Sequence, residues 1–201
     1  MPRLFAALEI PKDVAQSLSL LRGGLQGAGW IDVENYHLTL RFIGDVDERT
    51  ADDVLEAFDH VSKQEFELQL NGINVFGSKK PRTLYADITP NETLSSLQAS
   101  IDSQCRRIGI MPDGRKFTPH ITLARLRHTN HYALRDYLDA RSNFKSRTFN
   151  VEEFVVMSSK NSRGGGPYII EERYLLGANN NQDHLASSFS TSPEQPSSNM
   201  R

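Results

Sequence analysis

The chain contains one cysteine, no long apolar run and no large excess of charge of either sign. The single cysteine, Cys105, excludes an internal disulfide and is typical of a protein from a reducing compartment. No apolar run approaches the ~18 residues that a membrane-spanning helix needs, and the first residues lack the basic-then-apolar layout of a secretion signal. We therefore expect a cytoplasmic protein that makes no contact with a membrane.

The near balance of charges also limits the partners. A formal net charge of −2 argues against a broad nucleic-acid-binding surface, which would show as a strongly basic domain or stripe. Binding one phosphate at an RNA end is still compatible with it, because this needs only a few local cations. The length of 201 residues and the 38% hydrophobic content predict one domain or two small lobes, which we expect to be monomeric.

One four-residue pattern, His-x-Thr-Leu, occurs twice in the chain. The copies are His37-Leu38-Thr39-Leu40 and His120-Ile121-Thr122-Leu123. Because the chain has only 6 histidines, two such matches are improbable by chance. Both copies lie in runs of alternating apolar and polar residues, 36–43 and 120–126, which predict strands. In a strand, the His and the Thr of each copy share one face and the apolar residues point to the other.

This combination of residue types suits the hydrolysis of a phosphodiester. One histidine can take a proton from the attacking water while the other gives a proton to the leaving oxygen. The hydroxyls of Thr39 and Thr122 can donate to the phosphate oxygens as negative charge builds on them. We expect a site with two imidazoles and two hydroxyls, without a carboxylate, a thiol, a metal or a cofactor.

Two other interpretations of the histidines stay open at this point. His37 and His120 could be zinc ligands, although no His-Glu-x-x-His or Cys-x-x-Cys spacing accompanies them. Each could also be an ordinary strand histidine with no role in chemistry. The matched threonine in both copies favours the catalytic interpretation.

A looser repeat underlies the two motifs. Residues 4–10 predict a strand that ends at Pro11 and is followed by an amphipathic helix, and residues 84–89 predict the same arrangement around Pro90. The prolines are 79 residues apart and the motif histidines 83 apart. Helices are predicted at 50–61 and 130–139, and strands at 66–73, 149–158 and 168–176. The sequence therefore predicts an α+β fold of two pseudo-symmetric lobes.

In this fold each lobe is an antiparallel sheet with helices outside and one motif strand, and the active-site cleft lies between the lobes. We expect residues 1–177 to form this bilobal domain. Residues 178–201 are rich in Ser, Asn, Gln and Pro with few apolar side chains, so they cannot bury enough surface to offset their ordering entropy. They are expected to form a flexible tail.

The chain resembles the RNA 2′,3′-cyclic phosphodiesterases, also called 2′-5′ RNA ligase-like proteins, of the two-histidine phosphoesterase superfamily. The matching segments are residues 4–11, 37–44, 76–77, 81–85 and 117–125, in the order and spacing of that family. The resemblance covers nearly all of residues 3–176 and is more specific than either tetrapeptide alone.

The resemblance implies an enzyme that opens a 2′,3′-cyclic phosphate at an RNA end to leave a 2′-phosphate, without a metal. It also implies an association with the joining of tRNA halves through a 2′-5′ bond. By the same resemblance His37 is the proton donor and His120 the proton acceptor, while Thr39 and Thr122 hold the phosphate oxygens.

Three further residues are candidates for substrate binding. Strict alternation places Arg41 on the face of His37 and Thr39, where it could meet the phosphate. Arg125 should face away from His120 unless the strand bends, but an arginine at this place recurs in the family pattern, so we expect the backbone to depart from strand geometry near Ala124. Phe76 is a candidate to stack a terminal base.

The motifs leave several functions open. A 2′-5′ RNA ligase and a phosphodiesterase for 2′-5′-linked oligonucleotides would use the same two histidines. A non-catalytic module that binds RNA ends is a third alternative, which the two intact His-x-Thr pairs disfavour because binding alone does not require two groups that titrate near neutrality.

Overall fold

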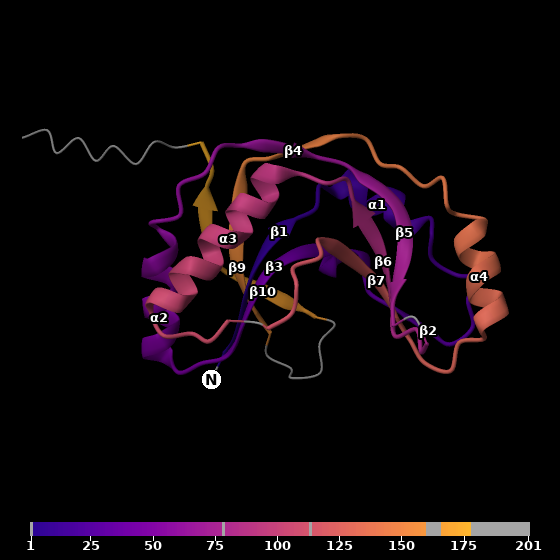
Figure 1. The fold of residues 1–201 in the computed structure, drawn as a ribbon, viewed down its shortest axis with the longest axis horizontal. Coiled ribbons are helices and arrows are strands. Elements are labelled where there is room, and N and C mark those ends of the chain that lie inside the picture. The colour runs from indigo at the N-terminus through magenta and orange to yellow at the C-terminus, as the bar shows by residue number, and fades with distance from the viewer. Residues whose placement is uncertain (1, 78, 113, 160–165, 178–201) are drawn as a thin grey trace, which may run out of the picture.

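The computed structural model describes residues 2–77, 79–112, 114–159 and 166–177. Its fold is α+β, as predicted (Figure 1). The elements in chain order are β1 (Arg3–Glu9), α1 (Lys12–Ser19), β2 (Ala28–Trp30), the 3-10 helix η1 (Val33–Asn35), β3 (His37–Asp45), α2 (Glu48–Phe58), β4 (Phe66–Leu68), β5 (Leu70–Phe76), β6 (Thr83–Ile88), α3 (Glu92–Arg107), β7 (His120–Leu126), α4 (His131–Asp139), β8 (Phe149–Val151), β9 (Glu153–Ser159) and β10 (Tyr168–Leu175).

The strands form two antiparallel groups that meet at one point. The order along the main sheet is β10-β9-β1-β3-β7-β6-β5, and β2 also pairs with β7. Strands β3 and β7 are joined only by the pair Leu38 and Ile121. We call the group of β10, β9, β1 and β3 the first lobe, and the group of β5, β6, β7 and β2 the second lobe. Each lobe therefore contains one motif strand, as the sequence predicted.

The lobes do not coincide with the two halves of the sequence. Strand β9 from the second half pairs with β1 in the first lobe, and β5 from the first half pairs with β6 in the second lobe. The short strands β4 and β8 pair with each other where the two chain segments cross between the lobes. The repeats are thus interlocked by an exchange of strands.

The helices cover the outer faces of both lobes (Figure 1). Helices α2 and α3 lie against the first lobe, where the Tyr174 hydroxyl of β10 donates to the Leu55 carbonyl of α2. Helix α4 covers the second lobe, and its Tyr137 hydroxyl donates to the carbonyl of Leu21, just after α1. Both motif strands bury Leu38 and Ile121 against this helix-covered core, so the motif histidines lie on the opposite face.

Helix α3 shows how the sequence produces this packing. Leu94, Leu97, Ile101 and Cys105 recur at helical spacing and are fully buried, so they form one apolar stripe against the sheet. The side chain of Asn91 accepts from the backbone N–H of Leu94 and caps the first turn.

Two predicted strands differ from the structure. Residues 66–73 and 149–158 each form two strands, because β4 and β8 pair with each other whereas β5 and β9 join the main sheet. The predicted tail, 178–201, lies outside the described residues. No helix among those described is long and apolar enough to cross a membrane.

Candidate active site

The contact between the lobes brings the two motifs together. Leu38 and Ile121 pair across β3 and β7, and both side chains are fully buried in the core. The residues beside them must therefore point to the opposite face of the sheet. These are His37, Thr39, His120 and Thr122, all half-buried. The structure thus groups the four residues around a pseudo-twofold axis that passes through the Leu38–Ile121 pair.

Both histidines are oriented by the same backbone hydrogen bond. The Nδ1 atom of His37 lies 2.8 Å from the carbonyl oxygen of Asn35, and Nδ1 of His120 lies 2.7 Å from that of Thr118. A carbonyl oxygen can only accept, so Nδ1 carries the proton in each ring. This leaves Nε2 of each ring to accept a proton when the ring is neutral and to donate one when it is protonated.

Burial lowers the pKa of both rings below the ordinary value of 6.5. For His37, the hydrogen bond to Asn35 opposes this effect, while the positive charges of His120 and Arg125 add to it. For His120, the Thr118 hydrogen bond opposes burial, Arg125 lowers the pKa further and the carboxylate of Asp87 raises it. The two rings are close enough for the charge of one to influence the other.

Two aromatic rings flank each histidine. The centroid of His37 lies 5.1 Å from that of Phe5 and 5.0 Å from that of Tyr168. The centroid of His120 lies 4.7 Å from Phe76 and 5.3 Å from Tyr85. The structure therefore places the predicted Phe76 beside His120. Tyr168 had no sequence signal, because β10 reaches the site only through pairing with β9.

The expected departure from strand geometry near Ala124 is present. In β7, Thr122 pairs with Tyr85 and Ala124 with Leu84, so Leu123 is an extra residue, a β-bulge. Leu123 and Ala124 are both fully buried, and the alternation of faces changes at this point. Arg125 therefore lies on the face of His120 and Thr122, where its guanidinium donates to the Thr83 hydroxyl over 3.2 Å.

The prediction that Arg41 shares the face of His37 is wrong, and the reason is an equivalent bulge in β3. Thr39 pairs with Ala7 and Arg41 with Ala6, so Leu40 is the extra residue. Arg41 is turned into the helix-covered core, where it is 5% exposed. Its Nε forms an ion pair with Asp102 of α3 at 3.0 Å, and its Nη2 donates to the Met111 carbonyl.

Phe42 takes the place that alternation had assigned to Arg41. It lies opposite Phe5, with ring centroids 6.0 Å apart, and is 51% exposed. Phe42 and Arg125 occupy equivalent positions after the two bulges. The two sides of the site therefore differ: an aromatic ring follows the first motif and a cation follows the second.

A carboxylate that no sequence motif indicated also lies beside His120. Asp87 of β6 pairs directly with His120 across the strands, so its side chain lies on the same face. Burial raises the pKa of this carboxyl group, while a hydrogen bond with Asn74 and the charge of His120 lower it. Glu9 is the corresponding residue opposite His37, but its carboxylate is paired with Arg173. The expectation of a site without a carboxylate is therefore corrected at Asp87.

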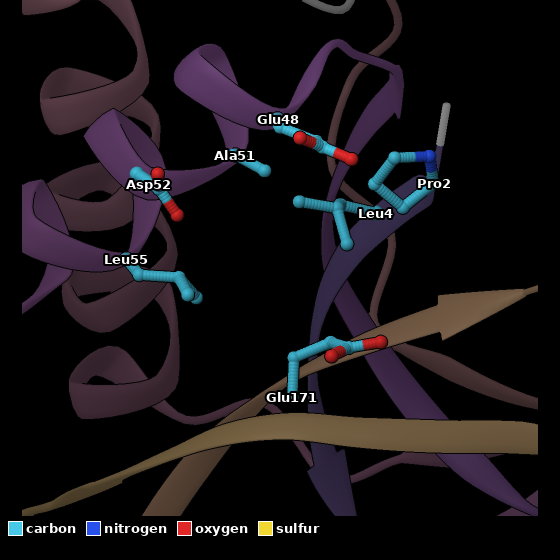
Figure 2. Close-up of a pocket in the computed structure, with 7 residues that line it drawn as sticks. All are labelled: Pro2, Leu4, Glu48, Ala51, Asp52, Leu55 and Glu171. Carbon is cyan, nitrogen blue, oxygen red and sulfur yellow. The ribbon is translucent and has the colours of Figure 1, made fainter.

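A pocket lies between α2, β1 and β10 (Figure 2), and none of its lining residues belongs to a motif strand. It is lined by Leu4 on the core face of β1, whereas the neighbouring Phe5 faces His37. Its lining includes Glu48, Asp52 and Glu171 and no cation, so it would repel a phosphate. Within the part of the chain that the structure describes, no three His, Cys, Asp or Glu side chains are grouped as metal ligands would be.

Comparisons with known proteins identify relatives. The chain is 28% identical over 153 residues to an RNA 2′,3′-cyclic phosphodiesterase from Aquifex aeolicus, which covers 74% of this chain and 81% of the relative. It is 27% identical over 187 residues to a protein of the same name from Methanothermobacter thermautotrophicus, covering 87% and 98%. Among solved structures, E. coli LigT complexed with 3′-AMP superposes with a TM-score of 0.71 at 24% identity, over 89% of this chain and 100% of that one.

The family model described as LigT-like phosphoesterase matches residues 8–85 and 87–168. Each matched segment contains one His-x-Thr-Leu motif, so the family pattern follows the internal repeat of the chain. Because the match spans most of the sequence, including all four residues around the Leu38–Ile121 pair, this chain belongs to the LigT-like phosphoesterase family.

Proposed function

We propose that this protein hydrolyses the 2′,3′-cyclic phosphate at an RNA end to a 2′-phosphomonoester, by general acid–base catalysis with His37 and His120. The observation that carries the proposal is the matched pair of imidazoles beside the Leu38–Ile121 contact. Each ring has Nδ1 fixed on a backbone carbonyl and Nε2 left for a substrate. Two such groups on one face meet the need for one acid and one base.

The proposed reaction is an in-line attack of water on the phosphorus. Nε2 of neutral His120 takes a proton from the water as its oxygen bonds to phosphorus. The bond from phosphorus to O3′ breaks, and Nε2 of protonated His37 gives its proton to O3′. The products are a 2′-phosphate and a free 3′-hydroxyl, and the histidines exchange their protons with solvent before the next turnover.

The surroundings of the two rings support these roles. Burial against Phe5 and Tyr168 lowers the pKa of His37, so once protonated it releases its proton more readily to a leaving oxygen. The carboxylate of Asp87 favours positive charge on His120, which stabilises the imidazolium that forms when this ring accepts the water proton. Thr39, Thr122 and Arg125 would donate to the phosphate oxygens.

The substrate class is supported by the named relatives and by the aromatic side chains. Both relatives described above are RNA 2′,3′-cyclic phosphodiesterases. Phe42 and Phe76 offer ring surfaces on either side of the site, which suits the stacking of unpaired terminal bases. The proposed role of Phe76 is therefore to stack against a terminal base of the RNA.

The first experiment is to incubate the purified protein, with EDTA present, with a short RNA that ends in a 2′,3′-cyclic phosphate. The 2′- and 3′-phosphate products are then separated by chromatography. We expect the 2′-phosphate alone. Formation of the 3′-phosphate would contradict the mechanism, and loss of turnover in EDTA would contradict a metal-free site. No conversion would favour the ligase, 2′-5′-oligonucleotide and binding-module alternatives.

Matched substitutions test the histidines. We expect His37→Gln and His120→Gln each to lower kcat by at least about 100-fold, since general acid–base catalysis contributes about that much or more. His60→Gln is the control, because His60 is exposed beyond the end of α2 and away from both motifs. Retained activity in both motif variants would overturn the proposal.

A further inference from the structure

The second lobe carries a concentration of positive charge, of which the proposed mechanism uses only Arg125. Residues 77–82, which connect β5 to β6, and residues 125–128, at the end of β7, contain 5 Lys or Arg and no Asp or Glu. The five are all exposed: Lys79, Lys80, Arg82, Arg125 and Arg127. We call these five residues the basic edge. In a chain with a net charge of −2, such a cluster is a local departure from the average surface.

Backbone hydrogen bonds hold the two segments of the basic edge together. The N–H of Leu126 donates to the carbonyl of Arg82 over 2.8 Å, and the N–H of Arg82 donates to Phe76 over 2.9 Å. The N–H of Arg127 donates to the carbonyl of Gly27 over 2.8 Å, which brings the segment before β2 alongside. Figure 1 shows the β5–β6 turn, the end of β7 and β2 at one end of the second lobe.

The basic edge continues directly from the candidate active site. Arg125 is on the face of His120 because of the bulge in β7. Arg127 follows two residues further, just past the end of β7, where continued alternation would put it on the same face. Because a strand rises about 3.3 Å per residue, Arg127 lies roughly 20 Å from His120. Bases stacked as in a duplex strand advance about 3.4 Å per nucleotide, so this distance corresponds to roughly six nucleotides. A mononucleotide held at the histidines cannot reach the far part of the edge.

The charges of the basic edge are available for a ligand. Among the ion pairs between described residues, none involves Lys79, Lys80, Arg82, Arg125 or Arg127. By contrast, Arg41, Arg147 and Arg173 are each paired with a carboxylate. Unpaired cations in a row suit a partner with regularly spaced negative charges, such as a single strand of RNA.

We propose that the basic edge binds the phosphate backbone of the RNA strand on the 5′ side of the reacting end, so that this enzyme prefers RNA polymers to cyclic mononucleotides. The inference rests on the proposed function for the position of the RNA end. The new element is a binding surface for the rest of the RNA strand. It also predicts that length, rather than base sequence, raises the affinity, because phosphates carry no sequence information.

The test measures binding separately from turnover. A 12-nucleotide RNA with a 5′ fluorophore and a 3′-terminal 2′-phosphate is titrated with the full chain, and the Kd is obtained from fluorescence anisotropy at several salt concentrations. The edge variant is Lys79→Ala, Lys80→Ala and Arg127→Ala together, which leaves Arg125 in place. The control is Lys12→Ala, Arg49→Ala and Arg135→Ala, three exposed cations on α1, α2 and α4, because it changes the net charge equally.

We expect the edge variant to raise the Kd at least about tenfold at 50 mM salt and to reduce the slope of log Kd against log salt by about 2, which is three single-strand phosphate contacts. The control should change the Kd less than about twofold. If both variants raised the Kd equally, the loss of net positive charge alone would explain the effect, and the proposal would be overturned. An unchanged Kd in the edge variant would overturn it as well.

Turnover distinguishes this proposal from the proposed function. Hydrolysis of 2′,3′-cyclic AMP should have the same kcat/KM in the native protein and the edge variant, whereas hydrolysis of the 12-nucleotide cyclic phosphate should fall with the affinity. If the native protein hydrolyses neither compound, the proposed function fails, and the anisotropy titration still decides the role of the basic edge. If both compounds are hydrolysed with equal kcat/KM by the native protein, the preference for polymers is refuted.

Discussion

At the scale of single residues, the two motif histidines share a sequence pattern and a backbone hydrogen bond but not an environment. Two aromatic rings flank each of them, but only His120 also faces a carboxylate that takes part in none of the ion pairs between described residues, that of Asp87. The carboxylate opposite His37, that of Glu9, is paired with Arg173. A pseudo-symmetric arrangement is thereby made asymmetric, which the proposed roles of one acid and one base require.

The lowered pKa of both histidines makes stability depend on pH. Burial is the main cause in both rings. As the pH falls, the unfolded chain, with a histidine pKa near 6.5, binds protons before the folded protein does. The stability associated with these rings is therefore fully present above about pH 6.5 and is lost as the pH falls through their folded-state pKa values.

We expect the double substitution His37→Gln and His120→Gln to weaken this dependence. Between pH 7 and pH 5, the midpoint of urea unfolding should fall more steeply for the native protein than for the variant. The measurement is a urea titration at each pH, followed by circular dichroism. Parallel curves for the two proteins would show that the histidines are not protonated at a lower pH in the folded state than in the unfolded chain.

At the scale of elements, a bulge in each motif strand decides which side chain reaches the site. The extra residues are Leu40 in β3 and Leu123 in β7, at the same place in the two motifs. In β7 the bulge turns Arg125 toward His120, while in β3 it turns Arg41 into the core toward Asp102. Two arginines that follow similar motifs thus have different surroundings, one on the face of the motif histidines and the other in a buried ion pair.

Arg125→Gln and Arg41→Gln form a matched pair that tests this division. Arg125→Gln should lower kcat/KM about 100-fold, because it removes a donor to the phosphate, and should leave the melting temperature nearly unchanged. Arg41→Gln should cost about 3 kcal/mol, because it removes the buried partner of Asp102, which then keeps only the exposed Arg106, and also removes the donor to the Met111 carbonyl. It should lower the melting temperature by about 10 °C.

Thermal denaturation and steady-state kinetics at 25 °C measure both effects. The activity of Arg41→Gln should remain within a few-fold of the native value at that temperature. A large loss of kcat/KM in a folded Arg41→Gln protein would indicate that Arg41 acts on the phosphate after all.

At the scale of the whole molecule, the exchange of strands makes each lobe depend on both halves of the sequence. The first lobe takes β1 and β3 from the first half and β9 and β10 from the second. The second lobe takes β2 and β5 from the first half and β6 and β7 from the second. Neither half contains a complete sheet, so neither can bury its own apolar face.

We therefore expect the fragments 1–81 and 82–177 to be unfolded separately and to fold when mixed. The measurement is circular dichroism and one-dimensional NMR of each fragment and of the equimolar mixture. The mixture should also recover turnover on a cyclic phosphate. A fragment that unfolds cooperatively by itself would contradict the interlocked topology.

The sequence predicted correctly those features that depend on a single helix or strand, such as its bounds and its buried face. Alternation located the strand of His120 to the residue, 120–126, and the sequence also predicted the amphipathic helix after Pro90, which is α3. The two motifs and the internal repeat were sufficient to predict the α+β class and the presence of one motif in each lobe. These features depend on local periodicity and on residue type, which a sequence states directly.

Arg41, Phe42 and Asp87 mark what sequence periodicity misses. A bulge changes the face of every later residue in a strand, and it arises from the register with a neighbouring strand rather than from the strand itself. Asp87 comes opposite His120, and Tyr168 comes beside His37, through pairing between segments far apart in the chain. The sequence by itself identified the two histidines and two threonines and the family to which the chain belongs. The tertiary structure decided which arginine and which carboxylate join them, because only pairing between strands brings those side chains to one face.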